Sequence, residues 1–326
     1  MIYLYKRNKT GICIDRVYGY DTIVELPDML EGFPVTELGA YIFSDHIDST
    51  ELKMMQEKEN FCTENGRATR PEDDMPQAAG NRVEEIRLPR QLRKIGRYAF
   101  YNCFHLKKLT FYGKMQDLGA GALTGCHRME QIAVETDEKG ESSLRDFLTE
   151  LPETLCVDIT IDGEYGRFWF PEFFEESIEN TPARIIMREM HGCGHMYRYC
   201  FDGTRFDVGE YDRLFPHVTV QEKPELVTRL ALYRLYWPWG LKEEAAKAYQ
   251  DYIAAHAGDA AEGILKRGER DILGLMARSG FMGRDGLGQM LDAASRGGNA
   301  ADAALLMDIK HERFGHVPLR ARTFEL

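Results

Sequence analysis

The stretch VEEIRLPRQLRKIGRYAFYNCFHLKKLTFYGKMQDLGAGALTGCHRMEQIAV, residues 83–134, repeats itself every 23 residues. Apolar, glycine and cysteine positions recur together at that spacing: Ile86, Leu109 and Ile132; Gly96 and Gly119; Cys103 and Cys126. A fixed period of this length is typical of a solenoid, in which each repeat is one turn of chain that buries its apolar side against its neighbours. The stretch therefore predicts a short stack of repeats.

Each repeat contains a short alternating segment. Residues 85–88, 108–111 and 131–134 alternate polar and apolar side chains, so each predicts a strand that buries its second and fourth residues. The remaining positions, with Tyr112 at the rim, form an exposed face: Glu85, Arg87, Lys108, Thr110, Tyr112, Gln131 and Ala133. Such faces bind other proteins in many solenoids, so this one is the candidate partner surface. Two alternatives stay open, a merely solvated face and packing of the repeats on the segment that follows.

A degenerate copy of the same unit precedes these repeats. Residues 24–27 match 86–89, and residues 38–43 match 95–100, with five additional residues between the two parts. We therefore expect the chain to begin with an irregular first repeat.

The shared pattern is I-x-L-P-x-x-L-x-x-I-G-x-Y-A-F-x-N-C-x-x-L, and it resembles the BspA-type leucine-rich repeat of bacteria over residues 20–135. The resemblance implies a right-handed solenoid with a ladder of strands along one side. Many relatives are secreted or surface-attached binding proteins. This sequence departs from them because its N-terminus has no apolar core of a signal peptide, so an adhesin role is not expected.

Charge is distributed unevenly along the 326 residues. The whole chain carries a formal net charge of −12, which disfavours nucleic acid and anionic membranes as partners. Residues 83–134 carry nine basic and four acidic side chains, whereas residues 135–180 carry three basic and fourteen acidic ones. With no apolar run long enough to span a membrane and an odd count of seven cysteines, we expect a cytoplasmic protein with reduced thiols. The basic repeats indicate a protein partner that is acidic.

An insertion at about 50–82 interrupts the repeats, and we place it within a repeat domain spanning 1–150. Residues 51–60 predict a short helix. Residues 66–82 are rich in glycine, proline and charge, so they predict a mobile surface loop. A tolerated insertion and a flap over the binding face are both compatible with this composition.

The rest of the chain predicts two further domains. Residues 151–222 read as a small mixed α+β domain, with a hairpin turning at Asp162-Gly163 between alternating segments. Residues 223–326 contain amphipathic segments separated by glycines, which predicts an array of α-helical hairpins of ankyrin-like shape. The fold class expected for the whole chain is thus α+β, with a solenoid, a mixed middle domain and a helical array.

Catalytic patterns are weak. The sequence contains no G-x-S-x-G motif and no phosphate-binding loop, so no catalytic residue and no cofactor is predicted. The sharpest chemical candidate is a set of side chains suited to zinc: His191, Cys193, His195 and Cys200. Their crowded spacing lacks the usual pair-loop-pair arrangement, and packed structural residues explain it as well. We expect a non-enzymatic protein-recognition module, an adaptor or scaffold, with a zinc-binding protein or metal-dependent enzyme as the alternative.

Overall fold

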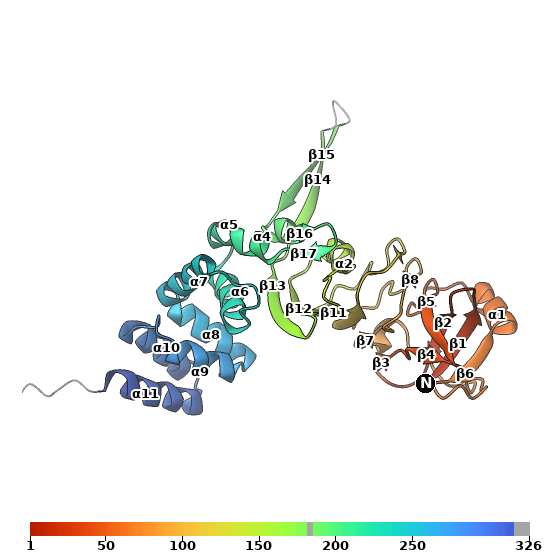
Figure 1. Cartoon of the computed structure of the whole chain (residues 1–326), viewed down its shortest axis with the longest axis horizontal. Helices are drawn as coiled ribbons and strands as arrows, with labels where there is room; N and C mark the ends of the chain where they lie inside the picture. The colour runs from red at the N-terminus through yellow and green to blue at the C-terminus, as the bar shows by residue number, and fades with distance from the viewer. Residues whose placement is uncertain (181–184, 316–326) are drawn as a thin grey trace, which may run out of the picture. The chain divides into compact units, whose positions relative to one another are not determined.

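The computed structural model describes residues 1–180 and 185–315, and the chain divides into two compact units, Met1–Tyr211 and Asp212–Leu326. Strands dominate the first unit, and the described part of the second is helical (Figure 1). The chain is therefore a mixed protein of α+β type, as the sequence predicts. The domain boundaries expected near residues 150 and 222 stay predictions.

The first unit contains a sheet with the strand order β10-β8-β5-β2-β1-β6, on which β4 pairs with β5. Its strands are β1 (Ile2–Arg7), β2 (Ile12–Tyr18), β4 (Met29–Leu30), β5 (Phe33–Leu38), β6 (Asn60–Thr63), β8 (Lys94–Ile95) and β10 (Asp117–Leu118). β2 lies between β1 and β5 and is buried along its whole length, so it forms the centre of this part of the core.

A second sheet carries the 23-residue repeats and has the order β13-β12-β11-β9-β7-β3. Its strands are β3 (Ile23–Glu25), β7 (Glu85–Arg87), β9 (Lys108–Tyr112), β11 (Gln131–Thr136), β12 (Leu155–Ile161) and β13 (Glu164–Phe170). Ile86 pairs in parallel with Leu109, Leu109 with Ile132, and Val24 with Ile86. The strands predicted from the period, and the alignment of the first irregular copy, are confirmed.

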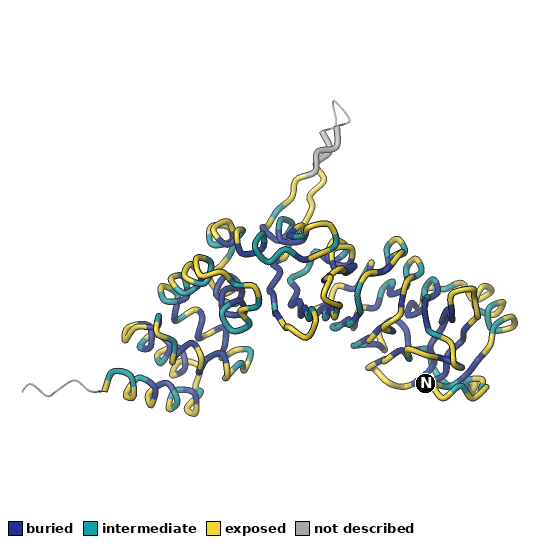
Figure 2. The backbone as a smooth tube through the Cα atoms, in the orientation of Figure 1, coloured by how far each residue is buried: buried dark blue, intermediate teal, exposed yellow. Residues whose placement is uncertain are grey.

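The repeats also pair in parallel within the first sheet, through β5, β8 and β10. Directly after these strands, the backbones of successive repeats lie very close together. A Cβ atom placed on Gly96 would lie 2.4 Å from the Ala40 nitrogen, and one on Gly119 would lie 2.3 Å from the Arg97 nitrogen. Only glycine permits this approach. Cys126 lies inside the stack, where its thiol donates to the Phe100 carbonyl at 3.1 Å, so the recurring cysteine is a buried packing residue. Along the strands of the first unit, buried stretches of backbone alternate with exposed turns (Figure 2).

The interval 50–82 contains more structure than the sequence predicts. The expected helix is present as α1 (Ser49–Lys58), capped by the Asp48 carboxylate. Strand β6 then joins the first sheet by pairing antiparallel with β1, and the 3-10 turn η1 (Gly80–Arg82) follows the buried Ala78 and Ala79. Sequence reasoning missed β6 because its apolar residues are adjacent and do not alternate.

Between the repeats and the second unit the chain forms small elements: α2 (Leu144–Glu150), β14 (Phe174–Asn180), β15 (Ile185–His191), α3 (Gly194–Tyr197), β16 (Phe201–Asp202), β17 (Arg205–Phe206) and α4 (Val208–Arg213). The predicted hairpin is confirmed as β12–β13, with positive φ at Asp162 and Gly163. Phe168 and Phe170 pack against the Tyr211 ring and form a local aromatic core.

The second unit contains α5 (Phe215–Gln221), α6 (Pro224–Tyr236), α7 (Glu243–Ala255), α8 (Ala257–Arg267), α9 (Arg270–Arg278), α10 (Arg284–Arg296) and α11 (Ala300–Phe314). Helix α8 packs on α10, and α9 packs on α11. The predicted helices are present, while the ankyrin-like likeness stays a prediction. No helix within residues 1–180 and 185–315 combines the length and apolar character needed to cross a membrane.

Candidate functional site

The second sheet brings the candidate partner-binding residues onto one face. Three rows cross strands β7, β9 and β11: Glu85, Lys108 and Gln131; Arg87, Thr110 and Ala133; and, on the last two strands only, Tyr112 and Glu135. All of these side chains are exposed or half-buried, whereas the intervening Ile86, Leu109 and Ile132 are buried. The face predicted from the alternation is thus assembled, and its role in binding stays a prediction.

The charges on this face are weakly paired. Arg87 lies 3.7 Å from Glu25, and both side chains are exposed, so solvent screens the pair and it contributes less than about 1 kcal/mol. Lys108 has no ion-pair partner within the part of the chain that the structure describes. The face therefore keeps cationic side chains that a partner could approach.

Beyond β11 the face continues into a polar network that sequence reasoning missed. Asp158 on β12 accepts hydrogen bonds from Arg167 at 2.6 and 2.9 Å, from the Tyr165 hydroxyl at 2.6 Å, and from the Gln131 amide. Burial acts to raise the pKa of Asp158, but the hydrogen bonds from Arg167 and Tyr165 outweigh it and hold the pKa below its ordinary value. Gln131 is thereby fixed in place. The hairpin register, which sets Asp158 opposite Arg167, was the signal available in the sequence.

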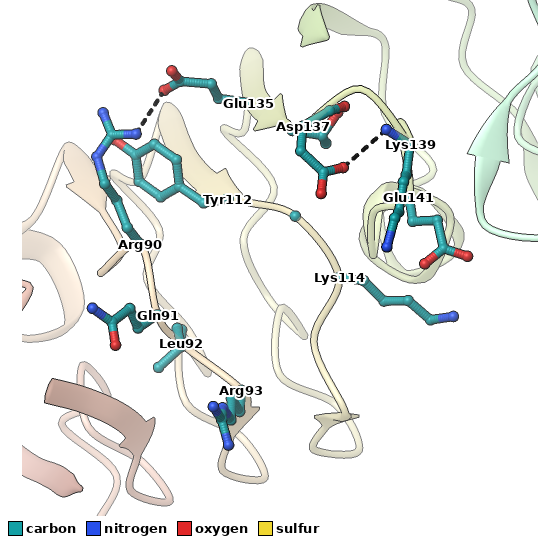
Figure 3. A pocket seen from close by; sticks show the side chains of 12 residues that line it. Arg90, Gln91, Leu92, Arg93, Tyr112, Lys114, Glu135, Asp137, Lys139 and Glu141 are labelled. Atoms are coloured by element: carbon teal, nitrogen blue, oxygen red, sulfur yellow. Dashed lines mark hydrogen bonds and ion pairs between the residues drawn. The ribbon is translucent and has the colours of Figure 1, made fainter. Parts of the chain in front are cut away.

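A groove of about 570 Å³ lies beside Tyr112, where the chain leaves β7, β9 and β11 (Figure 3). Its lining comes from three stretches, residues 90–93, 112–114 and 135–141. Clefts that bind ligands have volumes of roughly 300–1,000 Å³, so the groove is large enough for one. Of the seven face residues chosen from the sequence, Tyr112 alone lines it.

One side of the groove is formed by Arg90 and Tyr112. The Arg90 guanidinium carbon lies 4.3 Å from the centroid of the Tyr112 ring, and Arg90 lies 3.4 Å from the Glu135 carboxylate (Figure 3). Both charged side chains are about half exposed, at 56% and 48%, so this ion pair is also weak. The stacked ring therefore helps to hold the guanidinium in position.

Three further cations line the groove: Arg93, Lys114 and Lys139. Their side chains are exposed, and none has an ion-pair partner within residues 1–180 and 185–315. Besides Glu135, the acidic lining residues are Asp137 and Glu141. The Asp137 carboxylate accepts a hydrogen bond from the backbone N–H of Lys139 at 3.0 Å. Sequence reasoning missed these residues. The sequence does contain a pattern that points to them, because a basic side chain follows each of β7, β9 and β11 within a few residues.

The weak zinc candidates were His191, Cys193, His195 and Cys200. The imidazole of His191, at the end of β15, lies 3.0 Å from the Glu176 carboxylate. Cys193 and Cys200 are buried on either side of the short helix α3. Within residues 1–180 and 185–315, no group of three or more His, Cys, Asp and Glu side chains is placed to hold a metal ion. The zinc-centred alternative is therefore not supported.

Parallel strands stacked at a fixed period define a repeat protein. Residues 79–145 match a family model described as a BspA type leucine-rich repeat region (6 copies). The resemblance to BspA-type leucine-rich repeats is thus supported over this segment. Comparison with the curated proteins found no match, and comparison with the solved structures found none either.

Proposed function

We propose that residues 1–150 form a short right-handed leucine-rich repeat solenoid, followed by a mixed domain (151–222) and an ankyrin-like helical array (223–326). The family match over 79–145 supports the solenoid, as do the two parallel ladders that the repeats form. Each repeat buries its apolar side against its neighbours, so the stack presents a rigid outer surface.

The function that this arrangement supports best is non-catalytic protein recognition, as an adaptor or scaffold in a bacterial cytoplasm. The observation that carries the proposal is the register of β7, β9 and β11, which sets Glu85, Lys108 and Gln131 side by side on one face. Leucine-rich repeats are commonly protein-interaction modules. Because the strand backbone that carries this row is already ordered, little backbone entropy is lost on binding, which favours a recognition role.

The proposed partner is an acidic protein. Residues 83–134 carry nine basic and four acidic side chains, and Arg87 and Lys108 lie on the face itself. Complementary charge speeds the encounter of two proteins and selects between partners. The chain as a whole is acidic, with a net charge of −12, which argues against nucleic acid or an anionic membrane as the partner.

Affinity capture from the native cell lysate tests this function. The wild-type chain and the double variant Arg87→Glu/Lys108→Glu are immobilised, and the captured proteins are quantified. We expect specific proteins to be retained by the wild type and lost from the variant. The control Lys247→Glu/Lys266→Glu makes the same change of charge in the second unit and should capture them normally. Equal capture by the face variant and the wild type would contradict the proposal.

A further inference from the structure

We propose that the groove beside Tyr112 binds an acidic peptide segment of a protein partner, whose carboxylates are held by Arg90, Arg93 and Lys114. This inference rests on the proposed function in that it assumes a protein partner. It assigns a second surface, next to the strand face, and it names the chemistry that this surface recognises.

The balance of charge in the groove leaves cations available. Arg90 is the one basic lining residue whose side chain has an ion-pair partner within residues 1–180 and 185–315, Glu135 at 3.4 Å, and solvent screens that pair. A peptide carboxylate that approaches the outer edge of the Arg90 guanidinium can replace Glu135 or share the guanidinium with it, since the fork has five donors. Arg93 and Lys114 have no internal ion-pair partner within residues 1–180 and 185–315, so no internal ion pair is lost when they bind.

The segments that carry these cations are fixed before any ligand arrives. The backbone N–H of Arg90 donates to the Asp28 carboxylate at 2.6 Å, and that of Arg93 donates to the Thr36 carbonyl at 2.8 Å. Between these two residues the Leu92 side chain is buried, at 3% exposure. The segment is therefore anchored on both sides of its apolar contact, and little backbone entropy is lost on binding.

The stretch that follows β9 is held in the same way. The N–H of Gly113 donates to the Glu135 carbonyl at 2.9 Å, and the N–H of Met115 donates to the Ser143 hydroxyl at 2.9 Å. Lys114 lies between these two anchored positions. Its backbone is thus fixed while its side chain stays exposed, which suits a residue that contacts a ligand.

The acidic lining residues favour a peptide over a simple anion. Asp137 and Glu141 lie across the groove from Arg90, so the groove offers acceptors as well as cationic donors (Figure 3). A peptide supplies both complements, because its side-chain carboxylates accept and its backbone N–H groups donate. The phosphodiester backbone of a nucleic acid places only negative charge against these two carboxylates, which is repulsive.

The test measures the fluorescence anisotropy of a labelled hexaglutamate peptide titrated with the full-length protein at low ionic strength. The double variant Arg93→Glu/Lys114→Glu should bind at least tenfold more weakly than the wild type. The control Arg97→Glu/Arg128→Glu reverses two exposed charges in the same repeats, outside the groove, and should bind within about twofold of the wild type. Circular dichroism and thermal unfolding of each variant verify that the fold is intact.

Three results would overturn the inference. One is no binding of hexaglutamate by the wild type, and another is equal weakening by the groove variant and the control, which would mean diffuse attraction to the basic repeats. The third is displacement of the peptide by inorganic phosphate at similar concentration, which would make the groove a simple anion site. None of these results changes the outcome of the lysate capture with Arg87→Glu/Lys108→Glu. The groove assignment and the proposed function can therefore fail separately.

Discussion

Arg234 of α6 and Asp212 form a bidentate ion pair inside the second unit, with nitrogen–oxygen distances of 2.8 and 3.0 Å. The exposed fractions of the two side chains are 0% and 6%. The Tyr249 hydroxyl of α7 donates to the same carboxylate at 2.8 Å. The pair therefore joins the segment before α5 to α6 and α7, and its two charges are stable in the interior only because each neutralises the other.

Replacing Arg234 with Met should destabilise the second unit by about 3–5 kcal/mol, because Asp212 would be left buried with an uncompensated charge. Urea unfolding of the full-length chain, followed by circular dichroism, measures this loss. Lys247→Met is the matched control. Its partner Asp251 lies 2.9 Å away, but both side chains are more than 60% exposed, so the loss should be below about 0.5 kcal/mol. A loss of stability as small as that of Lys247→Met would show that the buried ion pair does not stabilise the second unit.

Replacing Gly96 with Ala should destabilise the first unit by about 1–3 kcal/mol. The added Cβ atom would meet the backbone of Gly39 and Ala40, at 2.4 to 2.7 Å, and backbone cannot move aside as a side chain can. Thermal unfolding compares this variant with Gly280→Ala, where a Cβ atom has open space. Wild-type stability in Gly96→Ala would mean that the repeats are not packed as closely as described.

The repeats were predictable because one signal recurs: the same spacing sets Ile86, Leu109 and Ile132 in register, and the parallel pairing follows it. Helices such as α6 were also predictable, since Pro224 and Trp237 mark its ends. Both kinds of element depend on local residues. Short sequence patterns are therefore enough to predict these strands and helices.

The groove and the Asp158 network depend instead on distant pairings. Arg90 and Glu135 are 45 positions apart in the sequence, and their approach requires β9 to pair between β7 and β11. Strand β6 combines both difficulties, because its short segment lacks alternation and its partner β1 lies at the start of the chain. The sequence thus locates the repeats and their exposed face, while the contacts that shape the candidate sites come from the tertiary structure.

Replacing Asp158 with Asn should destabilise the first unit by about 2 kcal/mol at neutral pH, since Arg167 loses its charged acceptor in a partly buried site. The pKa of this carboxyl group is lowered in the folded protein, so its stabilising effect is present above the ordinary pKa and is lost as the pH falls through the folded value. Urea unfolding at neutral pH and near pH 3 should therefore show a smaller difference in acid. A constant difference would contradict the lowered pKa.

Glu59 follows α1 and shares Lys6 with the buried Asp15, which anchors the insertion to the first sheet. The Lys6 ammonium lies 2.9 Å from Asp15 and 3.7 Å from Glu59. Burial, followed by the negative charge of Asp15, raises the pKa of Glu59 to about 7, and the opposing effect of Lys6 is smaller. At neutral pH the folded protein therefore holds this carboxyl group partly protonated.

Replacing Glu59 with Gln should accordingly stabilise the protein in alkali and leave it unchanged in mild acid. A carboxyl group whose pKa is raised on folding favours the folded state at low pH, and this contribution is lost as the pH rises through the folded value of about 7. The variant should match the wild type near pH 4, below the ordinary pKa of the group, and exceed its free energy of unfolding by about 1–2 kcal/mol near pH 8. Urea unfolding over this range measures the difference, with the exposed Glu57→Gln as control. Parallel stability curves for wild type and Glu59→Gln would show that folding does not raise the pKa of Glu59.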